Sequence, residues 1–283
     1  MLEPNVEPLR ATKRRPADIH PTALVAPLAV IEAGAVIGPW CQIGPDVVIE
    51  RGARLHAHVV VDGHTRIGAE AELYPFCTVG LAPQDLKYRG QPTSCEIGPR
   101  TQIREHCTIH RGTVTGVGVT RVGADCLVMA VAHVAHDCQI GNNVIIANNV
   151  VMGGHVQIAD QAVIGGVAAL HQYVRIGRGA IIGGATGVGG DVIPFGAVIG
   201  NRGRLVGLNV VGLKRRGTPS DVVRKLRAVY LSLFRDEGIF AARLAETRRR
   251  YGEDALVREI MEFIDAPSHR GLIRATLRWE GDD

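Results

Sequence analysis

The sequence predicts an all-β solenoid, built as a parallel β-helix and followed by a small α-helical domain. Three observations support this fold class. Aliphatic residues recur every six positions over most of the chain, aromatic residues make up only 4% of it, and glycine accounts for 35 of 283 residues. A period of six does not fit an α-helix, but it fits a short strand followed by a turn. A narrow core of aliphatic and small side chains needs few aromatic rings.

The repeat begins at Ile19 and stops at Pro194, where the pattern breaks. A small or β-branched residue follows each aliphatic residue by four positions, as Ala23 follows Ile19 and Ala29 follows Val25. Both positions point inward, because successive side chains of a strand alternate between its faces. Three repeats of six close one triangular coil of about 18 residues, and neighbouring coils stack about 4.8 Å apart like hydrogen-bonded strands.

We expect three parts along the chain. Residues 1–18 form a polar extension without the apolar segment of a secretory signal, residues 19–212 form the β-helix, and residues 213–283 form the helical domain. Two insertions interrupt the repeat, at 85–96 and at 115–121. Loops expelled from a solenoid commonly line its binding face, so these insertions are candidates for substrate contacts.

The helical domain follows the end of the repeat. The run Thr218-Pro219-Ser220-Asp221 is typical of a helix start, Gly238 is expected to end that helix, and two amphipathic segments follow around 239–251 and 253–265. Residues 200–283 carry 17 Lys and Arg against 12 Asp and Glu, a surplus of +5 that would attract an acidic partner. No stretch approaches 18 consecutive apolar residues, so we expect no membrane-spanning segment.

Most cysteines fit the repeat as buried small side chains and not as disulfides or metal ligands. We place Cys95 in the first insertion, and five others occupy the small inward position: Cys41, Cys77, Cys107, Cys126 and Cys138. This use of cysteine is consistent with a reducing, cytoplasmic location. We expect no nucleic-acid partner.

Several histidines fall on one face of the solenoid when the two insertions are left out of the count of six-residue repeats. Counting by sixes places His110, His136, His155 and His171 on the same face of successive coils, with His133 at the corner just before it. The first insertion leaves from this face after Gln84 and carries Asp85 and Lys87. We treat five other histidines as ordinary surface residues: His20, His56, His58, His64 and His269.

Such a row of imidazoles has two chemical uses. A neutral imidazole accepts a proton near pH 7, so the row could supply a general base and polar contacts to a substrate. Three imidazoles could instead bind zinc, as in some carbonic anhydrases built from repeats of six. The histidine pattern alone leaves both uses open.

Several short motifs resemble one enzyme family. They are QDLKY at 84–88, IHRGT at 109–113, AHVAHDC at 132–138, HQ at 171–172 and GLKRRG at 212–217. The chain resembles the UDP-N-acetylglucosamine acyltransferases that begin lipid A biosynthesis, over about residues 19–274. The resemblance implies a left-handed β-helix, a homotrimer with active sites between subunits, and transfer of an (R)-3-hydroxyacyl group from acyl carrier protein to the 3-hydroxyl of UDP-N-acetylglucosamine. It implies no cofactor and no metal.

The resemblance also assigns roles to residues. It makes His136 the general base, Asp137 the residue that orients it, and the backbone N–H of Gly154 the donor to the developing oxyanion. Asp85 would accept a hydrogen bond from the acyl 3-hydroxyl with Lys87 nearby. The other substrate-binding residues it implies are Gln84, His110, His133, His155, His171, Gln172, Asn209, Arg215 and Arg216.

Three positions bear on acyl-chain length and nucleotide binding in this family. Gly184 stands where a bulkier residue would block the acyl groove, so we expect longer acyl chains to be preferred. Position 202 is Arg where the family often has His, and position 211 is Val where an acidic nucleotide contact is common. The alternatives are another acyltransferase of the same fold and the zinc-dependent carbonic anhydrase type.

Overall fold

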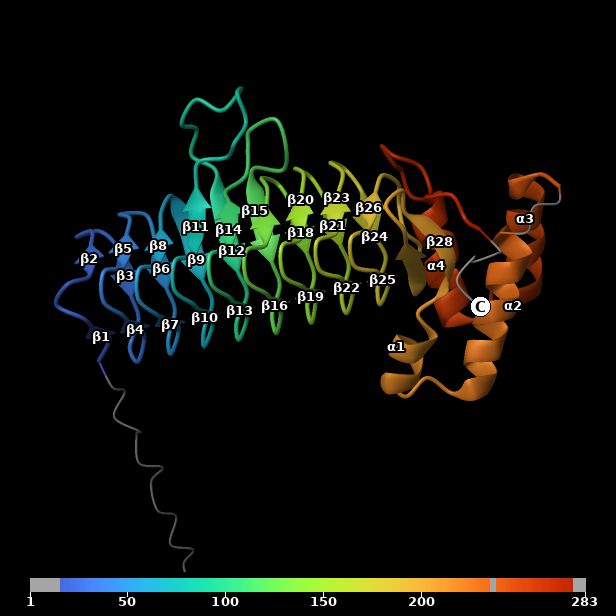
Figure 1. Cartoon of the computed structure of the whole chain (residues 1–283), viewed down its shortest axis with the longest axis horizontal. Helices are drawn as coiled ribbons and strands as arrows, with labels where there is room; N and C mark the ends of the chain where they lie inside the picture. The colour runs from blue at the N-terminus through green and yellow to red at the C-terminus, as the bar shows by residue number, and fades with distance from the viewer. Residues whose placement is uncertain (1–15, 235–237, 277–283) are drawn as a thin grey trace, which may run out of the picture.

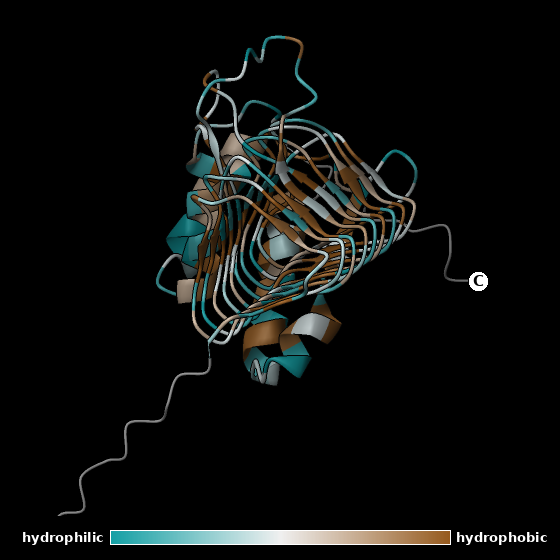
Figure 2. Ribbon diagram, turned by 90° about the vertical axis from the view of Figure 1, so that its left-hand side faces the viewer, coloured by the Kyte–Doolittle hydropathy of each residue, from teal (hydrophilic) through white to brown (hydrophobic). Residues whose placement is uncertain are grey.

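The computed structural model describes residues 16–234 and 238–276. The molecule is elongated. Stacked coils form a triangular prism along its long axis, and the helices gather at the C-terminal end (Figure 1). Seen end-on, the coils superpose as triangles whose sides carry many hydrophobic residues (Figure 2). Among the described residues, no helix combines the length and apolarity needed to cross a bilayer.

Three sheets, named A, B and C, form the sides of the prism, and each coil contributes one strand to each sheet. Their strands pair in parallel, except that β28 pairs antiparallel with β27 at the end of sheet A. Sheet A comprises β1 (Asp18–Ile19), β4 (Val36–Ile37), β7 (Arg54–Leu55), β10 (Glu72–Leu73), β13 (Gln102–Ile103), β16 (Leu127–Val128), β19 (Ile145–Ile146), β22 (Val163–Ile164), β25 (Ile181–Ile182), β27 (Gly196–Ile199) and β28 (Arg204–Leu208). Sheet B comprises β2 (Leu24–Val25), β5 (Gln42–Ile43), β8 (Val60–Val61), β11 (Thr78–Leu81), β14 (Thr108–His110), β17 (His133–Val134), β20 (Val151–Met152), β23 (Ala169–Leu170) and β26 (Gly187–Val188). Sheet C comprises β3 (Val30–Ile31), β6 (Val48–Ile49), β9 (His64–Ile67), β12 (Ser94–Ile97), β15 (Val119–Val122), β18 (Gln139–Ile140), β21 (Gln157–Ile158) and β24 (Arg175–Ile176).

The six-residue spacing places the core as expected. The aliphatic position of each repeat is buried along the prism, as at Ile37, Ile49 and Ile164, which are at most 1% exposed. Burying one such side chain contributes roughly 1.5–3 kcal/mol, and the stack repeats this gain at every coil. The core is therefore one continuous aliphatic column, too narrow for many aromatic rings.

All six cysteines are buried free thiols. Burial is the main cause that raises each thiol pKa, to about 12 for Cys77 and Cys138 and to about 11 for Cys107. The placement of Cys95 in an insertion is wrong. Strand β12 already begins at Ser94, because residues 94–97 pair with β9 on one side and β15 on the other, and this pairing buries the Cys95 side chain.

The two insertions begin and end three to four residues earlier than predicted, and they leave from the same edge of the prism. The first loop covers residues 82–93 and the second covers 111–118, each joining a sheet B strand to a sheet C strand. They project side by side above the prism between β11 and β15 (Figure 1). We call the line of turns between sheets B and C the B–C corner, and the other two lines the A–B and C–A corners.

Four helices follow the solenoid in the described part of the chain: α1 (Val210–Arg215), α2 (Ser220–Phe234), α3 (Phe240–Tyr251) and α4 (Ala255–Asp265). The structure adds α1, for which the sequence pattern offered no signal. The segment after α4 returns to the solenoid, where buried Asp191 accepts hydrogen bonds from Arg175 and Ser268. This tie brings residues 268–274 back beside sheet B.

Candidate active site

The B–C corner gathers the predicted histidines into one neighbourhood. His136 and Asp137 form the turn between β17 and β18, and the next coil places Gly154 and His155 in the equivalent turn. His171 and Gln172 follow one coil further on. The rings do not share one column, because they stand at successive positions of the turn.

His133 lies on β17 in sheet B, beside the end of β14. Its Cα pairs with Thr108, so its ring meets that of His110 edge-on at 5.0 Å between centroids. The Nδ1 atom of His133 is 2.7 Å from Thr108 Oγ1. Hence His110 and His133 form one pair and His136 and His155 form another, with 5.0 Å between the ring centroids of the second pair as well.

His136 and Asp137 contact each other although they are neighbours in sequence. Asp137 has a left-handed backbone, with φ of 61°, which turns its side chain back toward the preceding residue. The His136 Nδ1 atom lies 2.9 Å from Asp137 Oδ2. A carboxylate accepts only, so this bond holds the proton on Nδ1 and leaves Nε2 as the basic nitrogen.

The second loop holds the Asp137 carboxylate in place. Thr113 donates to it from its backbone N–H at 3.1–3.2 Å and from Oγ1 at 2.6 Å, and Gly118 N–H donates at 2.9 Å. Burial by itself would raise the pKa of Asp137, but the hydrogen bonds from His136, Thr113 and Gly118 outweigh it and lower that pKa. The carboxylate is therefore charged and fixed beneath the imidazole.

The lack of a side chain at Gly116 allows the second loop to lie directly against the Asp137 carboxylate. A Cβ built at Gly116 would stand 2.4–2.6 Å from the Asp137 carboxyl atoms, well inside contact distance. Only a residue without a side chain lets the loop cover Asp137 while its N–H groups donate. The second insertion thus supports the Asp137 carboxylate.

Gly154 packs directly against the His136 ring. A Cβ at this position would lie 2.5 Å from His136 Cε1 and 2.7 Å from Nε2. Within residues 16–234 and 238–276 its backbone N–H makes no hydrogen bond. An unpaired donor next to the basic nitrogen is suited to an oxygen atom that becomes negative during a reaction.

Ring contacts continue from the His136–His155 pair along the B–C corner. Tyr173 stacks on His155 at 4.4 Å and nearly parallel, and His269 from the returning C-terminal segment contacts Tyr173 at 4.8 Å with the rings tilted by 38°. Burial lowers the pKa of His155, while the charges of Asp137 and Asp85 act in the opposite direction. His269 therefore belongs to this ladder, which its interpretation as an ordinary surface residue missed.

His110 is the most deeply buried imidazole of the row. It is 6% exposed, and among the described residues its Nδ1 has no hydrogen-bond partner. Burial and the neighbouring His133 lower its pKa to about 4. Burial likewise lowers the pKa of His133. Both rings are neutral at pH 7, and since His133 Nδ1 contacts Thr108 and His110 Nδ1 is buried, each has its Nε2 left for a further contact.

The first loop carries Gln84, Asp85 and Lys87 above this corner. Asp85 accepts a hydrogen bond from the Lys87 N–H at 2.9 Å, and its charge reaches His155. Arg111 holds the loop by donating to the Tyr88 hydroxyl at 2.8 Å and to Gly80 O at 2.8 Å. The first loop is therefore held close to His155 at the B–C corner.

Four of the predicted residues lie at other corners. Asn209 caps α1 and donates to Gly179 O at 3.0 Å, which places it with Arg215 and Arg216 at the C–A corner. Gly184 occupies the turn between β25 and β26, at the A–B corner. One chain by itself does not bring these four residues to His136.

Comparison with known proteins gives a consistent result. Residues 191–273 match the family described as "Udp N-acetylglucosamine O-acyltransferase; Domain 2", and residues 28–63 and 120–154 match the bacterial transferase hexapeptide family. The chain is 50% identical to an acyl-[acyl-carrier-protein]–UDP-N-acetylglucosamine O-acyltransferase of Azorhizobium caulinodans, over 90% of this chain and 94% of that protein. The corresponding protein of Thermodesulfovibrio yellowstonii is 46% identical, over 91% and 99%.

The chain belongs to the UDP-N-acetylglucosamine O-acyltransferase family. Solved structures of this family include the Acinetobacter baumannii protein, with a TM-score of 0.87 at 38% identity over 90% of this chain and 99% of that one. The Francisella novicida acyltransferase superposes with a TM-score of 0.88 at 34% identity, over 92% and 95%. The left-handed parallel β-helix with a small helical domain is thus confirmed as the fold.

Three side chains of the site are of the types that bind metal ions. His136, Asp137 and His155 place ligand atoms within 4.8 Å of one another. Both Asp137 oxygens, however, already accept hydrogen bonds from Thr113, Gly118 and His136. A carboxylate so occupied fits the orientation of an imidazole better than the binding of a cation.

Proposed function

We propose that this acyl-[acyl-carrier-protein]–UDP-N-acetylglucosamine O-acyltransferase, which acts in lipid A biosynthesis, uses His136 as general base. The group transferred is an (R)-3-hydroxyacyl chain, and the acceptor is the 3-hydroxyl of UDP-N-acetylglucosamine, the first step of that pathway. The observation that carries the role of His136 is its 2.9 Å contact through Nδ1 with buried Asp137, which leaves Nε2 free to take a proton. Membership of the acyltransferase family supports the substrates.

The proposed reaction uses two groups of the B–C corner. His136 Nε2 removes the proton from the sugar 3-hydroxyl as its oxygen attacks the thioester carbonyl. The carbonyl oxygen becomes negative and accepts a hydrogen bond from Gly154 N–H. When the tetrahedral intermediate collapses, the C–S bond breaks and the imidazolium returns its proton to the leaving thiolate. Asp137 stabilises the imidazolium between these steps.

Neutral and polar residues around His136 supply the substrate contacts. We assign His110, His133 and His155 to the sugar, since their lowered pKa values keep them uncharged near pH 7. Asp85 and Lys87 on the first loop are assigned to the acyl 3-hydroxyl. The remaining contacts at this corner are Gln84, His171 and Gln172.

A homotrimer would complete the site. A column of exposed side chains runs along the A–B corner: His58 stacks on Phe76 at 4.9 Å, and Phe76 stacks on His106 at 4.9 Å. Phe76 is 49% exposed and Trp40 in the same column is 58% exposed. Exposed aromatic rings in a regular row are typical of a protein–protein contact.

The same association accounts for the residues at the other corners. Packing of the A–B corner of one chain against a neighbouring chain would carry Gly184 toward the acyl group, and the C–A corner would bring Asn209, Arg215 and Arg216 to the nucleotide. A Cβ at Gly184 would meet only Gly166 O at 3.3 Å, so this position opens outward. Longer acyl chains should accordingly be used better than short ones, and equal use across an acyl-length series would contradict this.

The decisive experiment measures transfer of a hydroxyacyl group from acyl carrier protein to UDP-N-acetylglucosamine. The His136→Ala variant should retain its fold and lose nearly all transfer, because among the described residues no other imidazole hydrogen-bonds to Asp137. His64→Ala, which removes an exposed imidazole of sheet C, serves as the matched control. Normal transfer by His136→Ala would refute the assignment of the base. Stoichiometric zinc in the active protein would favour the metal alternative instead.

The acyl donor and the six reduced thiols also support a cytoplasmic location. Acyl carrier protein is acidic, so the basic surplus of residues 200–283 supports docking near the helical domain. Reversing charges there should raise the KM for the carrier and weaken its salt dependence.

A further inference from the structure

The turn at the B–C corner repeats one backbone conformation on three successive coils. Asp137, His155 and Tyr173 follow one another at intervals of 18 residues, and all three have a left-handed backbone, with φ of 61°, 63° and 66°. The Tyr173 N–H donates to Gly154 O at 3.1 Å, one coil back. Equivalent side chains therefore stand above one another at about the 4.8 Å spacing of the coils. This register accounts for the stacking of Tyr173 on His155 at 4.4 Å, with 1° between their planes.

The coil after Tyr173 offers no ring to this column. Val188 pairs with the residue 18 positions before it, the length of a regular coil, whereas Val192 pairs with the residue 16 positions before it. The turn between these two paired residues is therefore two residues short, and it begins with Gly189 and Gly190. Neither glycine has a side chain that could cover the Tyr173 ring. The solenoid by itself leaves open the face of this ring that points away from the catalytic residues.

The returning C-terminal segment fills the place of the missing ring. The His269 ring lies 4.8 Å from that of Tyr173, which is about one coil spacing, and the two planes are tilted by 38°. Burial is the main cause that lowers the pKa of His155, and the charge of His269 acts in the same direction. His155, Tyr173 and His269 therefore form one column of three rings, although the third comes from a segment that follows the helical domain.

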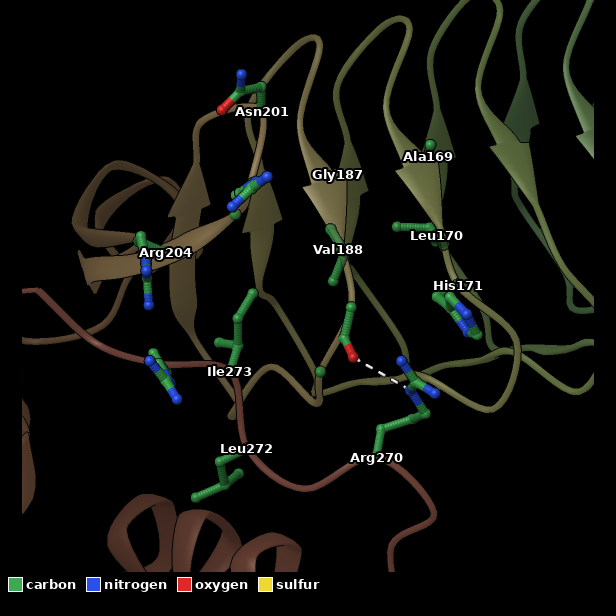
Figure 3. Close-up of a pocket in the computed structure, with 15 residues that line it drawn as sticks. Ala169, Leu170, His171, Gly187, Val188, Asn201, Arg204, Arg270, Leu272 and Ile273 are labelled. Atoms are coloured by element: carbon green, nitrogen blue, oxygen red, sulfur yellow. Dashed lines mark hydrogen bonds between the residues drawn. The ribbon is translucent and has the colours of Figure 1, made fainter.

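Hydrogen bonds anchor the returning segment on both sides of His269. The Ser268 hydroxyl donates to the buried Asp191 carboxylate at 2.6 Å. Arg270 donates from Nε to a backbone carbonyl of the short turn at 3.1 Å (Figure 3). Backbone hydrogen bonds of 2.8–2.9 Å continue this tie at residues 271–273. His269 thus stands between two fixed neighbours, and the backbone determines where its ring can lie.

His155 depends on ring contacts for its orientation. Among the described residues its imidazole makes no hydrogen bond, and its Nδ1 lies 3.9 Å from Asp137 Oδ2, beyond hydrogen-bond distance. Rotation of a histidine ring about its last side-chain bond is only weakly restricted by the side chain itself. His136 meets the His155 ring edge-on at 5.0 Å, and Tyr173 covers its flat face. The stacked tyrosine therefore determines which way the nitrogen atoms of His155 point.

We propose that His269 is a positioning residue for the acceptor: through Tyr173 it holds the His155 ring in the orientation that binds the sugar of UDP-N-acetylglucosamine. This inference rests on the proposed function, which assigns His155 to the sugar. The C-terminal segment then completes the acceptor site from beyond the helical domain. A contact between two aromatic rings changes an equilibrium roughly 2- to 12-fold, so its loss should weaken acceptor binding without abolishing transfer.

Steady-state transfer from the acyl carrier donor tests the proposal, with thermal unfolding measured in parallel. His269→Ala should raise the KM for UDP-N-acetylglucosamine roughly 2- to 12-fold, while kcat and the KM for the carrier stay within about two-fold. His269→Phe keeps a flat ring against Tyr173 and should restore the wild-type KM. His20→Ala removes an exposed imidazole beside Thr22 on the first coil and is the control.

The outcomes separate positioning from a purely structural role. An unchanged KM for UDP-N-acetylglucosamine in His269→Ala would overturn the proposal. Equal rises in the KM for both substrates, with a lower unfolding temperature, would also overturn it and would assign His269 to the attachment of the segment. Failure of His269→Phe to restore the KM would exclude ring stacking and overturn it as well. Absence of transfer by the wild-type enzyme would instead refute the proposed function.

Discussion

Adding one methyl group at Gly154 tests the catalytic geometry most directly. In Gly154→Ala, the new Cβ would lie 2.5 Å from His136 Cε1, 2.7 Å from Nε2 and 3.0 Å from Nδ1. Non-bonded carbon atoms rest about 3.5–4.0 Å apart, so the ring must move by about 1 Å. The backbone of Gly154 lies outside the left-handed region, so alanine adds no backbone strain there.

A displacement of this size has a predictable cost. Misplacing a catalytic group by about 1 Å lowers the rate on the order of 100-fold, since the base no longer reaches the hydroxyl in line. The movement also stretches the 2.9 Å contact with Asp137, which controls the tautomer of His136. We therefore expect Gly154→Ala to reduce kcat on the order of 100-fold with a smaller change in KM.

The assay is steady-state transfer to UDP-N-acetylglucosamine, with thermal unfolding measured in parallel. Gly207→Ala is the control, because a Cβ at Gly207 meets nothing within 4 Å. A Gly154→Ala enzyme with unchanged kcat would refute the proposed position of the base. Loss of activity together with loss of the folded state would be distinguished by the unfolding curve.

Three further predictions follow from the same structure. Asp137→Asn should lower kcat by roughly 10³- to 10⁴-fold without unfolding the chain, because the amide no longer fixes the tautomer of His136; an unchanged kcat would contradict this. His110 has its pKa lowered from 6.5 to about 4, so its contribution to stability is full above pH 6.5 and is lost as pH falls toward 4. Between pH 7 and pH 5 the wild-type chain should lose about 2 kcal/mol more unfolding free energy than His110→Gln, while the losses due to His133 and His155 remain in both; equal losses would exclude His110 as a cause. Phe76→Ser should weaken association in sedimentation velocity, whereas a variant of unchanged mass would remove the A–B corner from the interface.

The repeat was predictable because one physical constraint acts at every sixth residue. The inward aliphatic position identifies the strands without reference to distant contacts, and α2, α3 and α4 were similarly visible from their apolar spacing. The first and last residues of the two insertions could not be predicted in this way. Strands β12 and β15 each run for four residues, and the extra pairing that holds Ser94 and Val119 in the sheet depends on neighbours one coil away.

The candidate site was likewise predictable in part from the repeat, and the remainder depended on contacts that the repeat does not determine. Counting by sixes brought His136, His155 and His171 to one corner, yet it did not show that Asp137 could turn back to His136. That contact needs the left-handed backbone of Asp137 and the donors of a loop whose path the repeat does not determine. The position of His269 was likewise hidden, because it returns to the corner only after the helical domain.

The buried thiols allow unfolding of the solenoid to be measured by chemical labelling. Every cysteine faces the closed column of the prism, and several thiols have a pKa near 12, so the native chain should react very slowly with maleimides. Labelling would then appear only as coils open, and the order in which Cys41 and Cys138 become modified would map where unwinding starts. A cysteine introduced on the surface would also accept a probe without competition from the native ones.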